Sequence, residues 1–261
     1  MDVEDKILAI NDLNKIYKNS ENGVKEISFQ ISKGEILCLA GPNGSGKTTL
    51  LNSILGIIKK DKGSISLFGQ NVDNDAIKNR FAYISDEIIL IEELTGFEYL
   101  AFIKSMYKGI NKNQIITLLK IFDLEKDIDK LISSYSHGMK KKLQIISMIM
   151  KPFDVLVLDE PCRGLDVEAV YVLKKIVDSF KRKGKIILIT SHDLLFIEEI
   201  CDKILILTRG IVVGGGTPEE IKSQYKKNKI EEAFLEAAFL KERENEIDCY
   251  LEDYFDVIES I

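Results

Sequence analysis

The sequence predicts an α/β fold whose core is a mixed, largely parallel sheet, and three features support this prediction. Residues 35–40 form a short apolar run with the composition of a strand, and residues 155–158 and 186–189 are continuous apolar runs of the kind that forms strands buried on both faces of a sheet. A glycine-rich segment directly follows the first run and leads into helix-favouring residues. Between the second and third runs, residues 167–182 have the position of a crossover helix. Strands that alternate with helices in this way are typical of parallel pairing.

The first part of the chain predicts a second, antiparallel sheet. Residues 7–36 alternate apolar and polar positions around turn residues, and residues 65–68 form a further short strand. Residues 97–150 instead repeat apolar side chains at helical spacing and carry no strand signal. We therefore expect an antiparallel β subdomain and a helical subdomain inserted at about residues 90–150.

Two further elements complete the predicted domain. Residues 204–207 and 211–213 predict a closing hairpin that turns at residues 209–210. Residues 217–220 read TPEE, which is a capping box with proline at the first helical position. A helix is therefore expected to begin there.

Length and composition exclude several classes of protein. The chain has 261 residues, 45% of them apolar and 30% charged, as in an ordinary soluble domain with or without a subdomain. No apolar stretch approaches the roughly 20 residues that a transmembrane helix needs. The acidic start lacks the basic and apolar regions of a signal peptide. The four cysteines have no metal-ligand spacing, which favours free thiols in a reducing cytosol.

The net charge of −6 is concentrated at the end of the chain. Residues 241–261 contain eight acidic and two basic residues, so they carry −6 and the preceding residues balance to zero. No basic stripe suggests a nucleic-acid surface, and we expect no nucleic-acid partner. Residues 238–261 predict an acidic amphipathic extension, because apolar residues recur there at helical spacing. It either docks on the chain's own core or serves dimerisation or regulation.

The most informative segment is residues 41–49, which read GPNGSGKTT and match the phosphate-loop pattern G-x-x-x-x-G-K-[ST] in full. Its glycines let backbone N–H groups surround a chain of phosphates. Lys47 supplies a positive charge for the outer phosphates, and the Thr48 hydroxyl can bind Mg²⁺. The segment therefore predicts a nucleoside triphosphate site. The residues expected to contact the nucleotide are Gly41, Asn43, Gly44, Ser45, Gly46, Lys47, Thr48 and Thr49.

Two consecutive carboxylates, Asp159 and Glu160, follow the apolar run at 155–158. Ligands of parallel sheets bind at the carboxyl ends of the strands, where these side chains are expected to lie. Asp159 is placed to hold Mg²⁺, directly or through water. Glu160 is placed to polarise the water that attacks the γ-phosphate.

Between these two motifs, residues 135–141 read YSHGMKK at the start of an apparent helix. This segment resembles the signature motif LSGGQ of the ATP-binding cassette (ABC) proteins, and the resemblance covers about residues 7–237. Tyr17 falls where that family stacks an aromatic ring on adenine. Residues 164–166 (GLD) resemble the loop that joins the two halves of the ATPase dimer, and residues 190–193 (TSHD) resemble the segment with the switch histidine.

The resemblance implies a P-loop NTPase fold of the ABC type, with the ATPase domain in residues 1–237. It implies ATP and Mg²⁺ as cofactors and a head-to-tail dimer around two ATP molecules, formed with a second copy or with another ABC ATPase. In such a dimer, Ser136 and Gly138 of one domain contact the γ-phosphate held by the other. The residues expected to act in catalysis are Lys47, Glu160 and His192.

Four positions are unusual for the family. His137 and Met139 replace a glycine and a glutamine of the signature, and we expect ATPase activity to survive; a pH-sensitive histidine at the dimer seam is the alternative. Asp86 stands where most members carry a glutamine that touches Mg²⁺. Either Asp86 binds the metal, together with Thr48 and Asp159, or Glu87 replaces it after a shift of one residue. We expect Arg163 to form an ion pair at the dimer seam rather than to act in catalysis.

By resemblance, the chain is the ATPase subunit of a bacterial exporter of drugs, peptides or similar cargo, and it drives a separate integral-membrane permease. We expect it in the cytoplasm, held at the inner face of the cell membrane by that permease, which would contact residues 86–107. Two alternatives remain. One is a soluble ABC ATPase of a non-transport complex, such as iron–sulfur assembly, and the other is a weakly hydrolysing nucleotide switch.

Overall fold

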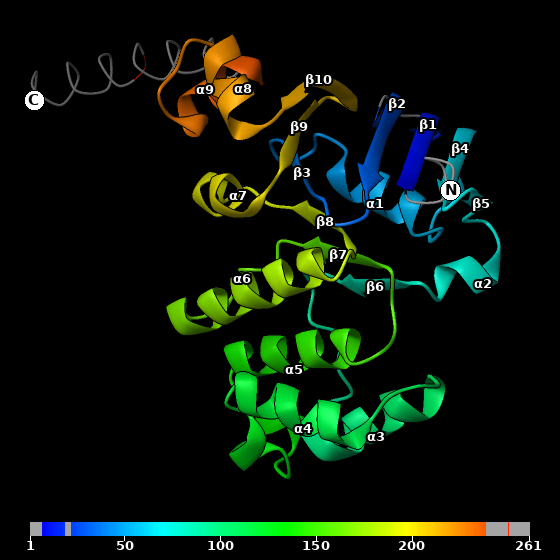
Figure 1. Cartoon of the computed structure of the whole chain (residues 1–261), viewed down its shortest axis with the longest axis vertical. Coiled ribbons are helices and arrows are strands. Elements are labelled where there is room, and N and C mark those ends of the chain that lie inside the picture. The colour runs from blue at the N-terminus through cyan, green and yellow to red at the C-terminus, as the bar shows by residue number, and fades with distance from the viewer. Residues whose placement is uncertain (1–6, 19–21, 239–249, 251–261) are drawn as a thin grey trace, which may run out of the picture.

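The computed structural model describes residues 7–18, 22–238 and 250, and its centre is a six-stranded sheet (Figure 1). Strands β9, β3, β8, β7 and β6 pair in parallel in this order, and β10 adds an antiparallel edge next to β9. The predicted α/β fold with a mixed, largely parallel sheet is confirmed. The strands are β3 (Ile36–Ala40), β6 (Phe81–Ile84), β7 (Val155–Asp159), β8 (Ile186–Thr190), β9 (Lys203–Thr208) and β10 (Ile211–Gly216).

The three apolar runs of the sequence form the buried centre of this sheet, since every residue of β3, β7 and β8 is buried. Successive side chains of a strand point to opposite faces, so each run contributes to two hydrophobic layers. Cys38, Leu156 and Ile187 belong to the layer that the helices complete. Their neighbours Leu37 and Val155 belong to the layer on the other face.

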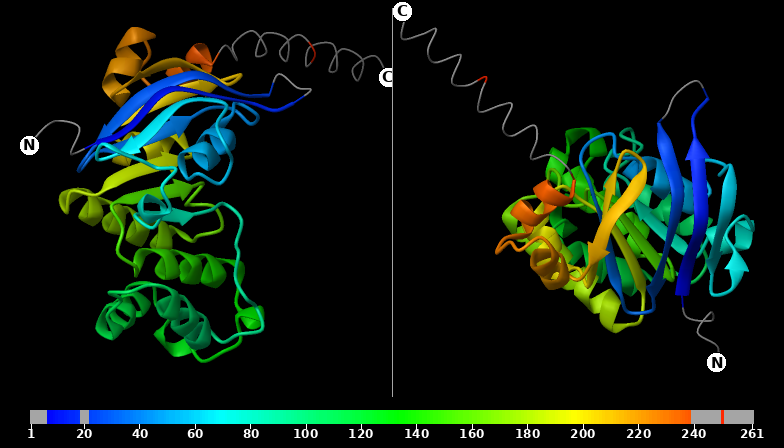
Figure 2. Two further views of the ribbon diagram at one scale, coloured as in Figure 1. Left: turned by 90° about the vertical axis from the view of Figure 1, so that its right-hand side faces the viewer. Right: turned by 90° about the horizontal axis from the view of Figure 1, so that it is seen from above.

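That other face is covered by helix α1 (Lys47–Ile54) and by the predicted antiparallel sheet, which has the order β2-β1-β4-β5 (Figure 2). Leu50, Leu51 and Ile54 of α1 are fully buried in one cluster with side chains of both sheets. The helix that begins at the phosphate loop is therefore fixed between two sheets. The strands are β1 (Ile7–Ile16), β2 (Gly23–Ser32), β4 (Lys62–Leu67) and β5 (Gln70–Asn71).

Helices dominate the region predicted as an inserted helical subdomain. It contains α3 (Gly96–Met106), α4 (Lys112–Ile121), two short 3-10 turns, η2 (Glu125–Asp127) and η3 (Ile132–Ser134), and α5 (His137–Ile149). α5 also packs on the core, because its Leu143 and Ile146 share a cluster with Ile84 of β6. α5 thus belongs to both the helical subdomain and the core, and no sharp boundary separates the two. The predicted domain limits remain a prediction.

The remaining elements follow the sequence closely. The crossover helix α6 (Val167–Arg182) has the predicted limits, and β9 with β10 forms the predicted hairpin. The predicted capping box opens α8: the Thr217 hydroxyl accepts from the Glu220 N–H, and the Glu220 carboxylate accepts from the Thr217 N–H. The other helices are α2 (Asp75–Lys78), α7 (Leu194–Ile200), α8 (Pro218–Gln224) and α9 (Ile230–Ala237).

Of the extension predicted for residues 238–261, all but residues 238 and 250 lie outside the described part of the chain. Within the described part, none of the helices combines the length and the apolar character needed to span a membrane.

α5 holds the segment that follows β6 through two buried side chains. The ammonium of Lys141, a residue with no exposed surface, donates to the carbonyl oxygens of Ser85 (2.8 Å) and Asp86 (3.3 Å). The side-chain amide of Gln144 donates to the carbonyl of Glu87 at 2.8 Å and to the Ser85 hydroxyl at 3.1 Å. Burial lowers the pKa of Lys141. Segment 85–87 is thus attached to the helical subdomain.

Replacing Lys141 by methionine should leave those two carbonyl oxygens without their donor. An unsatisfied buried polar group costs about 1–3 kcal/mol, and each kcal/mol lowers the thermal midpoint of a protein of this size by about 2–4 °C. The control is Lys140→Met, which removes only an ion pair with Glu92 at the surface. Such pairs contribute less than about 1 kcal/mol. Equal losses for the two variants in thermal unfolding would contradict this account.

Candidate active site

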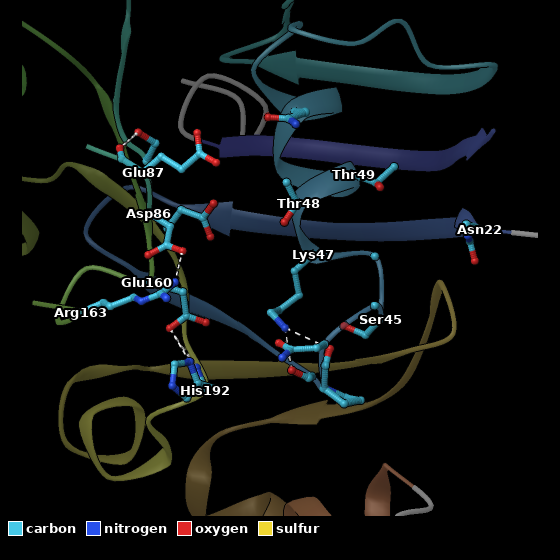
Figure 3. Close-up of a pocket in the computed structure, with 18 of the residues that line it drawn as sticks. Asn22, Ser45, Lys47, Thr48, Thr49, Asp86, Glu87, Glu160, Arg163 and His192 are labelled. Carbon is cyan, nitrogen blue, oxygen red and sulfur yellow. Dashed lines mark hydrogen bonds and ion pairs between the residues drawn. The ribbon is translucent and has the colours of Figure 1, made fainter. Parts of the chain in front are cut away.

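The carboxyl ends of β3, β7 and β8 meet at one edge of the sheet, and an open cavity of about 1090 Å³ lies there. Figure 3 shows Lys47 on one side of this cavity and Asp86, Glu160 and His192 on the other. The cavity is lined by the phosphate loop and α1 (Gly41, Pro42, Asn43, Gly44, Ser45, Gly46, Lys47, Thr48, Thr49, Asn52), by Asn22 and Gly23, by the β6 segment (Tyr83, Ser85, Asp86, Glu87, Ile89), and by Asp159, Glu160, Arg163, His192 and Phe234.

Two glycines of the phosphate loop are required by its surroundings. Gly46 has φ +105°, and a Cβ there would lie 2.9 Å from the Gly23 carbonyl oxygen. A Cβ at Gly41 would lie 2.3 Å from the carbonyl oxygen of Leu207. The loop therefore packs directly on the backbone of β2 and β9, which fixes its N–H groups at the sheet edge.

The loop is prepared for an anion. Lys47 donates to the carbonyl oxygens of Gly41 at 2.6 Å and Pro42 at 3.2 Å, and burial lowers its pKa. The Ser45 hydroxyl is buried and has no hydrogen-bond partner among the described residues. α1 begins at Gly46 without a side-chain cap or an acidic residue in its first turn. Free N–H groups at a helix N-terminus favour a phosphate.

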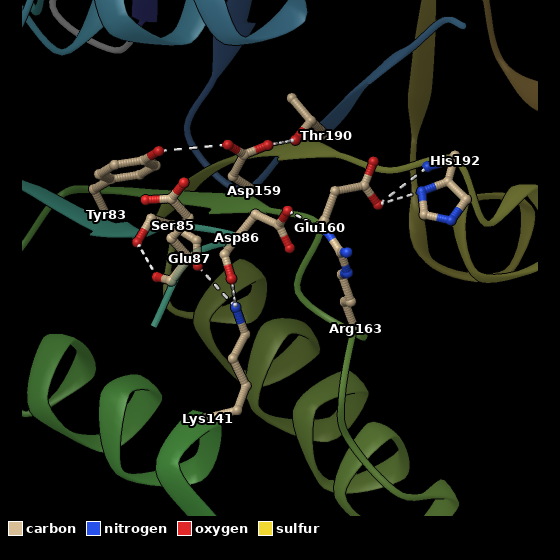
Figure 4. Close-up of polar contacts among 10 residues, drawn as sticks. All are labelled: Tyr83, Ser85, Asp86, Glu87, Lys141, Asp159, Glu160, Arg163, Thr190 and His192. Atoms are coloured by element: carbon tan, nitrogen blue, oxygen red, sulfur yellow. Dashed lines mark hydrogen bonds and ion pairs between the residues drawn. The ribbon is translucent and has the colours of Figure 1, made fainter. Parts of the chain in front are cut away.

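Asp159 lies at the end of β7, where it is nearly buried (Figure 4). Its carboxylate accepts from the Thr190 hydroxyl and from the Tyr83 hydroxyl at 3.4 Å. Burial raises the pKa of Asp159, and the negative charges of Glu160 and Asp86 add to this increase. A cation close to these carboxylates would therefore be stabilised.

Glu160 has a left-handed backbone, with φ +46°, directly after the strand. Such a conformation costs a non-glycine residue about 1–3 kcal/mol and occurs often at functional sites. Its carboxylate Oε2 lies 2.8 Å from Nδ1 of His192 and accepts from the His192 N–H at 3.3 Å. β8 thus supplies the group that orients Glu160, because His192 follows the end of that strand.

Arg163 pairs within the chain, whereas the sequence analysis expects it to form an ion pair at a seam between chains. Its Nη1 lies 2.6 Å from Oδ2 of Asp86. The reason is the turn after β7, in which the Arg163 N–H donates to the Glu160 carbonyl at 3.2 Å and the chain folds back toward segment 85–87. Asp86 and Glu87 both line the cavity, so the two alternatives for the metal ligand remain.

The oxygen ligands of this cavity fit a magnesium ion. The Oδ1 atom of Asp86 is buried without a hydrogen-bond partner among the described residues, and Asp159 and Thr48 line the same space. In the described part of the chain, no cluster of three or more His, Cys, Asp or Glu side chains forms a metal cage. Mg²⁺ needs none, since it binds one or two carboxylates together with substrate phosphates. Thr48 and Asp159 would hold it together with Asp86 or Glu87.

Three residues of the expected site lie elsewhere. Tyr17 follows β1, is 42% exposed and lies outside the cavity lining, with the Lys15 ammonium 5.9 Å from its ring. Neither Ser136 nor Gly138 is among the described residues that line the cavity. The Ser136 hydroxyl instead caps α5 and accepts from the Met139 N–H at 3.2 Å.

Sequence reasoning missed the supporting residues. Tyr83 and Lys141 contact the site from the β6 strand and from α5, and Phe234 of α9 reaches the cavity from near the end of the chain. Residues 81–84 form a largely buried strand, but no local pattern indicates which of its side chains reaches Asp159. No local sequence pattern indicates that Phe234 lines the cavity.

A phosphate loop after β3, an acidic pair at the end of β7 and a histidine after the intervening strand β8 define a P-loop nucleoside triphosphatase. Residues 24–163 match the family model described as ABC transporter. An uncharacterized ABC transporter ATP-binding protein of Nostoc sp. is 34% identical over 226 residues, which cover 82% of this chain and 68% of that protein. The SkfA peptide export ATP-binding protein SkfE of Bacillus subtilis is 30% identical over 208 residues, covering 78% and 87%.

A solved structure of the ATP-binding subunit of an ABC transporter superposes with a TM-score of 0.81 at 30% identity, covering 88% of this chain and 99% of that one. The chain belongs to the ABC transporter family of ATP-binding proteins. It is an ATPase with the ABC ATPase fold, and its domain binds ATP.

Proposed function

We propose that this chain is the ATP-hydrolysing subunit of an exporter and that it acts as a head-to-tail dimer around two ATP molecules. The observation that carries the proposal is the position of Ser136 and Gly138 outside the cavity of their own chain. α5 begins at Ser136 and has no acidic residue in its first turn, so its N-terminus suits an anion held by another subunit. A second copy or another ABC ATPase would supply that subunit.

In hydrolysis, each side chain has a distinct role. Lys47 leaves the loop carbonyls and neutralises the outer phosphates, while the N–H groups of the loop hold the others. Glu160 accepts a hydrogen bond from the attacking water, and His192 keeps its carboxylate in place through Nδ1. Bound Mg²⁺ would supply charge neutralisation between the phosphates, held by Thr48, Asp159 and Asp86. Tyr17 is proposed to contact the adenine ring.

The permease is proposed to bind at residues 86–107. This region carries an unusual concentration of exposed large apolar side chains, which mark interaction surfaces. Acidic side chains lie among them at positions 87, 92 and 93. Through this contact the subunit would sit at the inner face of the cell membrane, and the similarity to SkfE favours export of a peptide or a similar cargo. The exposed apolar residues are Ile89, Ile91, Phe97, Phe102 and Met106.

Two alternative functions can be distinguished from this proposal by experiment. The Asp86–Arg163 ion pair favours a nucleotide switch that hydrolyses slowly, because it occupies an oxygen of the metal ligand. A steady-state ATPase assay distinguishes such a switch from the proposed ATP-hydrolysing subunit. A soluble non-transport complex, as in iron–sulfur assembly, would give a soluble protein and not a permease on purification from native cells.

Replacing Glu160 by glutamine should lower ATP turnover by at least about 100-fold, because an amide cannot accept a proton from the attacking water. ATP affinity should stay within a few-fold of the wild-type value, and the ATP-bound variant should accumulate as a dimer in size-exclusion chromatography. The control is Glu168→Gln on the first turn of α6, outside the cavity lining. Turnover close to the wild-type rate in Glu160→Gln would contradict the role given to Glu160.

Replacing Phe97 by serine should abolish co-purification of a polytopic membrane protein from detergent-extracted native membranes. Phe97 is 58% exposed on α3, so the substitution removes a contact surface and not part of the core. ATP turnover of the isolated variant should equal that of the wild type. Ile211→Ser on β10 serves as a control, since Ile211 is 46% exposed and lies outside residues 86–107. Retention of the membrane protein by Phe97→Ser, or its equal loss from both variants, would contradict the proposed surface.

A further inference from the structure

The wall of the cavity opposite the phosphate loop carries an excess of negative charge. Asp86, Glu87, Asp159 and Glu160 come from two segments, and all four line the same space (Figure 4). Burial raises the pKa of Asp159, and the charges of Glu160 and Asp86 raise it further, as expected for carboxylates that face one cavity. Their combined negative charge favours a cation in the cavity, although within the described residues no three of these side chains are arranged as a metal cage.

The cations around this wall differ in how firmly they are held. Lys47 is tied to two carbonyl oxygens of the phosphate loop. Lys141 is completely buried and donates to two backbone carbonyls behind the wall. Arg163 lines the cavity itself, its side chain is 67% exposed, and it forms an ion pair with Asp86. Of the three cations, Arg163 is thus the one placed to leave its partner at little cost.

The two carboxylate oxygens of Asp86 lie in different environments. Its Oδ2 accepts from Arg163 at 2.6 Å, whereas its Oδ1 is buried and has no hydrogen-bond partner among the described residues. A guanidinium bound to one oxygen neutralises the carboxylate and also fixes its orientation. A divalent cation that approaches Oδ1 must therefore work against the positive charge of Arg163.

We propose that Arg163 is a positioning residue that acts as an internal counter-ion: it holds Asp86 and keeps the carboxylate wall from retaining a divalent cation until a nucleotide arrives. The triphosphate brings its own negative charge, which offers Arg163 another anionic partner and leaves Asp86 to the metal that enters with the nucleotide. This inference rests on the proposed metal ligands Asp86 and Asp159. It is independent of the permease and of the dimer.

The test measures Mn²⁺ binding to the nucleotide-free protein, from the amplitude of the electron paramagnetic resonance signal of free Mn²⁺. Arg163→Gln should bind Mn²⁺ about tenfold more tightly than the wild type, because a charge within a few ångströms of the site is removed. The double variant Asp86→Asn/Arg163→Gln should return to the wild-type affinity, because both charges are gone.

The matched control is Arg182→Gln. Arg182 is 69% exposed at the side chain and pairs with Asp178 at 3.0 Å near the end of α6, so the same substitution breaks a similar pair away from the cavity. Its Mn²⁺ affinity should equal that of the wild type. Thermal unfolding of all variants reports any structural effect separately, since a merely structural role of Arg163 would lower stability without a gain in Mn²⁺ affinity.

Unchanged Mn²⁺ affinity in Arg163→Gln would overturn the proposal. So would a gain that persists in the double variant, because the relevant carboxylate would then be Glu87 or Glu160 and not Asp86. None of these measurements requires ATP hydrolysis or a membrane partner. If the proposed transport function were wrong, the Mn²⁺ result could still be interpreted. Likewise, a negative Mn²⁺ result would not argue against the transport function.

Discussion

The structure depends on one constraint, the parallel pairing of β3, β8 and β7. Because parallel strands end at the same edge, this order places three loops side by side, although the first loop precedes the other two by more than 100 residues in the chain. The first loop has the phosphate-binding sequence pattern, the second carries Asp159 and Glu160, and the third carries His192. All residues of the three strands are buried, so the strands that lead to this edge are closely packed between two hydrophobic layers.

At this edge, several polar groups have an unfavourable backbone conformation or electrostatic environment. Glu160 occupies a left-handed backbone conformation, and Asp159 is buried beside like charges. Ser45 and Asp86 each keep a buried oxygen without a partner in the described structure. These features each cost stability, and a phosphate chain with its metal would relieve the last two. The site is therefore built for its ligand and not for the empty protein.

Short-range sequence patterns predict most elements of the fold. The buried strands, the limits of α6 and the capping box of α8 follow from short-range apolar runs, helical spacing and turn chemistry. The phosphate loop and the acidic pair were equally visible, because their residues are adjacent in the chain. The contact between Arg163 and Asp86 joins residues 77 positions apart, and that between Lys141 and Ser85 joins residues 56 apart. Only the packing of α5 and of the turn after β7 determines them, so no local pattern predicts them.

The central claim is that a complete active site needs residues from two chains. The most direct measurement is ATP turnover in a mixture of two variants, Lys47→Met and Ser136→Arg, each of which should be nearly inactive alone. In a head-to-tail dimer formed from both, one of the two sites has an intact phosphate loop and an intact Ser136, so random pairing should restore about a quarter of the wild-type turnover. A mixture as inactive as its two components, or a fully active Ser136→Arg variant on its own, would contradict the claim.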